Sequence, residues 1–173
     1  LISEGSTIFL DGSSTVLCMV NYLRDEQNIT VITNSLRAAT RLCEKRIDVY
    51  CTGGKLVPEA LVCVGPYSEN MIESMTADLM FFSSQGLSAD GKISDFSENE
   101  TCQRRQMLQH ARKRYFLCDS SKLGKSFLFT VCRTSDIDGV ISDVDVSKSL
   151  ESGSLPTQQA CGAANSSATT AEG

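Results

Sequence analysis

The stretch that decides the fold is Thr7-Ile8-Phe9-Leu10-Asp11-Gly12-Ser13-Ser14-Thr15. Its first four residues predict a buried strand, and the small polar residues that follow predict a turn. Behind the turn, apolar residues at helical spacing predict a helix: Val16, Met19, Val20 and Leu23. A strand, a short turn and a helix in this order are typical of the units from which α/β folds are built.

The same alternation of apolar strands and amphipathic helices continues along the chain. Further strands are expected at residues 29–33, 48–52, 60–64, 79–83, 115–118 and 139–142, and helices at residues 36–43, 71–75 and 100–113. The run at 79–83 is almost wholly apolar, which is typical of a strand covered on both faces. Residues 127–132 are ambiguous. The pattern predicts a single α/β domain with a Rossmann-like, mostly parallel sheet flanked by helices.

Length and composition limit the classes of function. The chain has 173 residues, which suits one domain, and its net charge of −5 makes it a poor candidate for gripping DNA by itself. No apolar run is long enough to span a bilayer, and no signal peptide is visible. We expect a cytoplasmic protein with a folded domain at residues 1–146 and a disordered Ser/Ala-rich tail at residues 147–173.

Cysteine, histidine and basic residues give little sign of catalysis. The eight cysteines lack metal-knuckle and redox-pair spacings, so most read as buried hydrophobes in a reducing compartment, with a disulfide framework left open. His110 is the only histidine, which argues against a His-dependent triad. The basic stretch from Arg104 to Arg114 reads mainly as the solvated face of a helix, with Leu108, Ala111 and Tyr115 on the opposite stripe. We expect no metal and no cofactor.

The turn at residues 11–15 is the strongest candidate site. A strand-to-helix turn of small residues points backbone N–H groups at one spot, and the helix start adds partial positive charge there. The hydroxyls of Ser13, Ser14 and Thr15 add further donors, so the turn suits a phosphate dianion. Simple N-capping of the helix explains the same residues equally well.

Two later turns follow the same plan. Thr33-Asn34-Ser35 comes after a β-branched strand and precedes a helix, and it should open on the same edge of the sheet, where α/β proteins bind ligands. Capping is again the alternative. Asp119-Ser120-Ser121-Lys122 follows an apolar strand, and Lys122 there can reach back to a phosphate, unless this is an ordinary polar turn. Gly86 and Gly91 either allow close approach of a ligand or only form turns.

Seven such elements stand in the order and spacing of the effector domain of DeoR-family regulators, which the chain resembles over residues 2–145. The remaining ones are Gly53-Gly54-Lys55-Leu56, then Asp78, Phe82, Gly86-Leu87 and Gly91, then Glu98, Glu100, Arg104 and Met107, and finally Val140-Ile141-Ser142-Asp143. The resemblance implies a fold similar to ribose-5-phosphate isomerase and the coenzyme A transferases. It implies a phosphorylated sugar as effector, a homo-oligomer, no membrane partner, and DNA contacts only through a winged helix-turn-helix that would precede Leu1.

The resemblance also implies site residues. The ligand-binding set is expected to be Asp11, Gly12, Ser13, Ser14, Thr15, Thr33, Asn34, Ser35 and Lys122, with Asp78, Gly86 and Glu98 near the sugar. This chain departs from the family at two positions, where Ser13 replaces a glycine and Val16 replaces a threonine. Those changes narrow the phosphate approach and remove one donor, so ligand choice could differ.

An enzyme of the same fold is the alternative function. Sugar-phosphate isomerases with this fold carry a pair of acids after the central strand and a lysine before a glycine run. Here Asp78 is followed by apolar residues, and Gly86 is followed by Leu87 and no lysine–glycine run. Because isomerisation needs a carboxylate base with acidic and cationic partners, the sequence favours a sensor over an isomerase or a transferase.

Overall fold

The computed structural model describes residues 1–150, which fold around a six-stranded sheet. All neighbouring strands in this sheet are parallel, in the order β11-β9-β6-β1-β2-β3. The strands are β1 (Thr7–Leu10), β2 (Thr30–Thr33), β3 (Asp48–Cys51), β6 (Ala77–Phe82), β9 (Ala111–Cys118) and β11 (Gly139–Ser142). The predicted Rossmann-like, mostly parallel sheet is confirmed.

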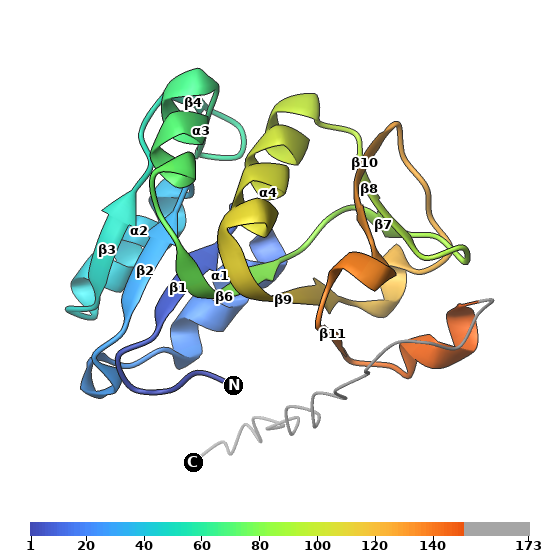
Figure 1. Ribbon diagram of the computed structural model, residues 1–173, viewed down its shortest axis with the longest axis horizontal. Coiled ribbons are helices and arrows are strands. Elements are labelled where there is room, and N and C mark those ends of the chain that lie inside the picture. Colours follow the sequence, from blue (N-terminus) through green and yellow to red (C-terminus); the bar gives the residue numbers. More distant parts are fainter. Residues whose placement is uncertain (151–173) are drawn as a thin grey trace, which may run out of the picture.

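Helices cover both faces of the sheet (Figure 1). They are α1 (Ser14–Met19), α2 (Leu36–Glu44), α3 (Pro66–Glu73) and α4 (Glu98–His110). On the α1 and α2 face, Ile8 of β1 packs in one core with Val16 of α1. On the α3 and α4 face, Phe9 packs in a second core with Met107 of α4. Consecutive residues of β1 therefore enter opposite cores, which explains why residues 8–10 of β1 and 79–82 of β6 are all apolar.

Two smaller antiparallel sheets complete the domain. β7 (Gly86–Leu87), β8 (Lys92–Asp95) and β10 (Phe129–Arg133) form one, and β4 (Lys55–Val57) with β5 (Val62–Val64) forms a hairpin. The ambiguous residues 127–132 thus lie largely in a strand. Of the strand predicted at residues 60–64, only the last three residues form a strand, which is β5. It pairs with β4 in the hairpin and does not join the main sheet.

The predicted helix at residues 100–113 ends earlier, at His110. β9 begins at the next residue, Ala111, which pairs with Ala77 of β6. Ala111 and Tyr115 therefore lie in a strand, and our expectation that they continue the apolar stripe of the helix is wrong. Pairing along a buried central strand outweighs the helical period in this stretch, as tertiary context often does.

After β11 the chain makes a 3-10 turn at Val146–Ser149, and Val146 is buried. The first residues of the tail predicted at 147–173 therefore belong to this turn. The prediction for residues 151–173 lies outside the described residues. Within the described part of the chain, no helix combines the length and the apolar character needed to cross a membrane.

The seven cysteines in the described residues are free thiols, although only Cys63 and Cys118 are buried. Cys18 and Cys43 are exposed, whereas burial raises the pKa of Cys118 and of Cys132 to about 12. We expect iodoacetamide at about pH 8 to label Cys18 and Cys43 first, because the thiolate is the reactive form. Peptide mass mapping after short exposure measures this, and early labelling of Cys118 would contradict it.

Candidate functional site

The carboxyl ends of the central strands meet where the order of the sheet reverses. From β1 the sheet extends through β2 to β3 on one side and through β6 and β9 to β11 on the other. Ligands of open α/β sheets bind at such a switch point. A pocket of about 430 Å³ lies there, lined by Gly12, Ser13, Ser14, Thr15 and Lys122 among other residues. We call it the switch-point pocket.

The turn after β1 serves the fold and the pocket together. The hydroxyl oxygen of Ser13 accepts a hydrogen bond from the backbone N–H of Val16 at 3.2 Å, so Ser13 is the N-cap of α1. Asp11 accepts from the backbone N–H of Ser13 at 3.2 Å and from its hydroxyl at 2.6 Å. The capping interpretation therefore holds for Ser13. Ser14 and Thr15, in the first turn of α1, also line the pocket, and N–H groups in a first helical turn lack intrahelical acceptors.

Lys122 joins the ends of the central strands. It lies in a 3-10 turn after β9, Ser120–Lys122, and its side chain is only 13% exposed. Its ammonium group donates to the hydroxyl of Thr15 at 2.8 Å and to the hydroxyl of Ser83, just after β6, at 2.6 Å. Asp119 lies 3.5 Å from the same ammonium group. The structure therefore brings Lys122 to the turn after β1, as the sequence predicts.

A buried ion cluster forms the base of the pocket, and the sequence did not reveal it. The guanidinium of Arg104, 3% exposed, donates to Asp11 at 2.6 Å, to Asp95 at 2.8 Å and to Glu100 at 3.0 Å. Our interpretation of the basic stretch as a solvated face is therefore wrong for Arg104. The spacing of Glu100 and Arg104, four residues apart on a helix, was the available signal, but it is also typical of surface pairs.

In this cluster, burial and the neighbouring charges of opposite sign shift pKa values in opposite directions. Burial alone would lower the pKa of Arg104, but attraction to Asp11, Asp95 and Glu100 outweighs it and raises that pKa, so the guanidinium stays charged. Burial raises the pKa of Glu100 above its ordinary value despite the attraction of Arg104, and repulsion from Asp95 and Asp11 acts in the same direction. Glu100 and Arg104 both line the pocket, and the side chain of Glu100 is the more exposed of the two, 22% against 3%.

The second predicted turn, Thr33-Asn34-Ser35, lies at the same edge of the sheet but is covered by β5. The backbone N–H of Cys63 donates to the carbonyl of Asn34 at 2.7 Å, and Ser35 forms an isolated bridge with Val62. Thr33 and Ser35 are fully engaged in local structure, since Thr33 accepts from the N–H of Ser35 and Ser35 caps α2. Neither lines the pocket, so for these two residues the capping alternative replaces our ligand-binding expectation.

Three further predicted residues lie away from the pocket. Asp78 stands near the start of β6, where it accepts from the backbone N–H of Thr7 at 3.0 Å, so it lies at the opposite edge of the sheet. Gly86 is buried in β7, and a side chain there would meet the carbonyl of Lys125, so its glycine is required by packing. Glu98 is exposed at the first turn of α4. None of the three lines the switch-point pocket, where we predicted them.

Sequence reasoning also missed residues that do line the pocket. Arg37 reaches it from α2, Ser84 and Gln85 from the segment after β6, and Glu100 from α4. Glu98 and Glu100 lie two residues apart, so they point to different faces of the helix. Which of them faces the pocket can be predicted only when the start of the helix is known. Arg37 lies just after the cap Ser35, on a helix face that the sequence predicts to be solvent-exposed. No sequence pattern therefore marks it as a residue of the pocket.

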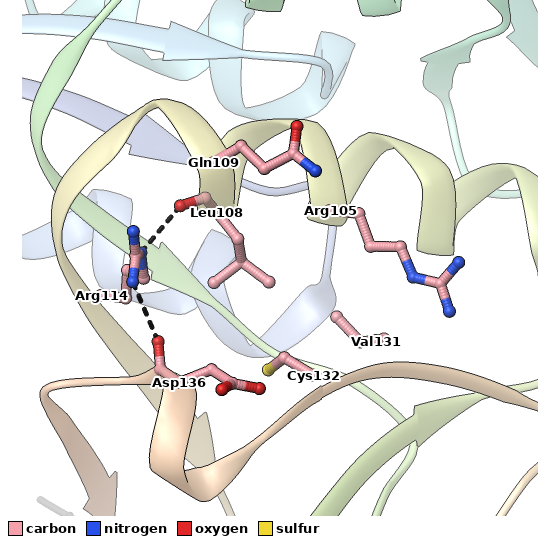
Figure 2. Close-up of a pocket in the computed structure, with 7 residues that line it drawn as sticks. All are labelled: Arg105, Leu108, Gln109, Arg114, Val131, Cys132 and Asp136. Carbon is pink, nitrogen blue, oxygen red and sulfur yellow. Dashed lines mark hydrogen bonds between the residues drawn. The ribbon is translucent and has the colours of Figure 1, made fainter.

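A second hollow, of about 340 Å³, lies between α4 and β10. Figure 2 shows Arg105 and Arg114 at its opposite ends, with Cys132 between them. Arg114 donates to the backbone carbonyls of Leu108 at 2.7 Å and Asp136 at 3.1 Å, and Arg105 donates to a carbonyl of β10. Both guanidinium groups hold backbone segments together, so this hollow has a structural explanation.

Comparisons with known proteins agree with this fold and with one class of function. The model of the family described as "DeoR C terminal sensor domain" matches residues 1–144. The chain is 32% identical to "HTH-type transcriptional regulator GolR" of Listeria innocua, covering 87% of this chain and 59% of that protein. It is 31% identical to the "Lactose phosphotransferase system repressor" of Staphylococcus epidermidis, covering 83% and 57%. The chain thus spans less than two thirds of either relative.

Solved structures show the fold alone. Ribose 5-phosphate isomerase A from Methanocaldococcus jannaschii superposes with a TM-score of 0.50 at 16% sequence identity, over 74% of this chain and 49% of that one. This confirms the predicted likeness in fold to ribose-5-phosphate isomerase. Because the family model accounts for most of the chain and regulators of that family align along most of its length, the chain belongs to the DeoR C terminal sensor domain family.

Proposed function

We propose that this chain is the ligand-sensing domain of a transcriptional repressor of sugar metabolism, and that its effector is a phosphorylated sugar bound in the switch-point pocket. On this proposal the sensor is a homo-oligomer and acts on DNA through a helix-turn-helix domain that lies outside the described residues. The names of the relatives support the regulatory class, since one is an HTH-type regulator and another a repressor of a lactose phosphotransferase system.

The position of Lys122 is the observation that carries the phosphate assignment. A nearly buried ammonium group beside small residues with hydroxyl and backbone donors matches the charge and the hydrogen-bonding needs of a phosphate. We assign the phosphate to Ser14, Thr15 and Lys122, with Gly12 and Ser13 shaping the turn. The sugar hydroxyls then lie toward Glu100 and Gln85, which line the same pocket.

The isomerase alternative has weaker support. A sugar-phosphate isomerase needs a carboxylate free to move a proton at the reacting carbons. Asp78 lies at the other edge of the sheet. The carboxylates at the pocket are each held by a cation, Asp11 and Glu100 by Arg104 and Asp119 by Lys122. The isomerase neighbours support the fold only, whereas the aligned relatives are regulators.

Replacing Lys122 with alanine is expected to weaken binding of a phosphorylated sugar about tenfold, since a hydrogen bond to a charged group contributes roughly 1.5 kcal/mol or more. A thermal-shift panel of sugar phosphates and the matching free sugars identifies the ligand, and calorimetry measures the loss. Lys125→Ala, which removes an exposed lysine three residues further on, is the matched control. Equal affinity in the Lys122 and Lys125 variants would remove Lys122 from the site, and turnover of ribose 5-phosphate would favour the enzyme.

A further inference from the structure

The ion cluster below the pocket has an excess of negative charge. Three carboxylates, from Asp11, Asp95 and Glu100, surround the one guanidinium of Arg104. Asp11, Asp95 and Arg104 have side chains no more than 3% exposed. Buried charge without a partner is costly, so a cluster of this composition favours a neutral carboxyl group. Within the described residues, no group of carboxylates, cysteines or histidines is arranged to hold a metal ion that could supply the missing charge.

A second observation points to the same carboxyl group. Asn34 is 2% exposed, and its side-chain nitrogen donates to the carbonyl of Cys63 at 3.1 Å, which fixes the orientation of the amide. Its side-chain oxygen is then the one buried polar side-chain atom in the described residues that has no hydrogen-bond partner. That oxygen needs a donor, because an unsatisfied buried acceptor destabilises the fold.

Asn34 and Glu100 line the same small void beside the pocket, and this void is too narrow to admit a water molecule. The other side chains that line it already have partners: Asp11 accepts from Arg104 and Ser13, Arg104 donates to its three carboxylates, and Gln103 donates to Glu69 and accepts from Ser68. An ionised carboxylate on Glu100 can only accept hydrogen bonds, whereas a protonated one donates. One proton on Glu100 therefore reduces the charge excess and supplies a hydrogen-bond donor at the void that Asn34 also lines.

We propose that Glu100 takes up one proton when an anionic ligand enters the switch-point pocket, so that ligand binding strengthens as the pH falls. The inference rests on the proposed anion-binding function of that pocket. An anion there adds further negative charge beside Glu100, which disfavours its carboxylate form. By linkage, the same proton then favours the bound anion.

The charges that face Glu100 come from several elements. Asp11 follows β1, Asp95 ends β8, and Arg104 lies one turn further along α4. Across the pocket stand Arg37 of α2 and, in the turn after β9, Asp119 and Lys122. His110 lies at the far end of α4, about 15 Å along the helix axis from Glu100.

Sulfate is the probe for the test, because it is a dianion that does not itself take up a proton near neutral pH. The affinity of the whole chain for sulfate is measured by calorimetry from about pH 5 to about pH 8, in buffers of different ionisation enthalpy. We expect affinity to fall about tenfold across this range, with uptake of up to one proton per bound sulfate. Glu100→Gln should bind sulfate with the affinity of the acid form at every pH and with no proton uptake.

Two controls and one direct measurement complete the test. Glu98→Gln and His110→Gln should keep the wild-type dependence on pH. In wild-type protein, the carboxyl carbon signal of Glu100 should titrate at a higher pH with sulfate than without it. Sulfate binding that is independent of pH, or an unchanged slope in Glu100→Gln, overturns the inference while leaving the anion pocket in place. No sulfate binding at any pH overturns the anion pocket itself, and this inference with it.

Discussion

Replacing Arg104 with alanine is expected to destabilise the domain by about 3–5 kcal/mol, the range found when one partner of a buried ion pair is removed. The change would leave Asp11, Asp95 and Glu100 close together without their shared cation. Two of these carboxyl groups are as buried as Arg104 itself, so water cannot replace the lost hydrogen bonds. Urea unfolding followed by circular dichroism measures the change in the free energy of unfolding.

Arg105 provides the control for this prediction, because it is the next residue on the same helix but is exposed. Arg105→Ala should cost only about 1 kcal/mol, because it removes one exposed hydrogen bond to the carbonyl of Thr130 and leaves no buried charge without a partner. The loss in Arg104→Ala should also shrink at low pH, where protonated carboxyl groups no longer repel one another. Similar stabilities for the Arg104 and Arg105 variants would mean that the cluster does not hold the domain together.

Replacing Gly12 with alanine is expected to cost about 2 kcal/mol of stability, within the range of overpacked core positions. A Cβ atom on Gly12 would overlap the side chain of Val62 and would lie 3.5 Å from the side-chain oxygen of Asn34. The reason is the β4–β5 hairpin, which folds back over the turns after β1 and β2 and leaves room only for a glycine. Thermal and urea unfolding of the variant measure the cost.

A double-mutant cycle separates this steric effect from other consequences of the change. Val62→Ala removes the atoms that collide with a side chain at position 12, although it leaves a cavity when made alone, since Val62 is fully buried. The double variant should therefore lose less stability than the sum of the single losses, by about 1 kcal/mol or more. Strictly additive losses would show that the turn tolerates a side chain and that Val62 is not the obstacle.

Much of the fold could be predicted from local patterns. The apolar run that became β6 identified the centre of the sheet, because only a strand covered on both faces needs apolar residues throughout. The turn at residues 11–15 and Lys122 both follow apolar strands, and parallel strands deliver their carboxyl ends to a common edge. This rule predicted that Lys122 reaches back to that edge, where the structure places it beside Thr15, 107 residues away in the chain.

The missed parts depend on contacts between distant segments. Thr33 and Ser35 reach the expected edge, but only the return of the β4–β5 hairpin decides that they are covered. Arg104 stands in a helix full of polar residues, and its burial follows from Asp11 and Asp95, which arrive from β1 and β8. No pattern within one segment carries that information. Asp78 illustrates the opposite error, since its position in the chain suggested the site while its place at the start of β6 excludes it.

The hydrogen bonds of Lys122 imply that a ligand must exchange with part of the protein. An ammonium group has three hydrogens, and those of Lys122 already face Thr15, Ser83 and, at the longest distance, Asp119. On the proposed function, an anion that docks here would take over the hydrogen directed at Asp119 and would repel that carboxylate. Asp119 caps the 3-10 turn after β9, and the chain beyond this turn runs beside β7. If an effector binds as proposed, the backbone that it would displace first is therefore this connection between the turn after β9 and β7.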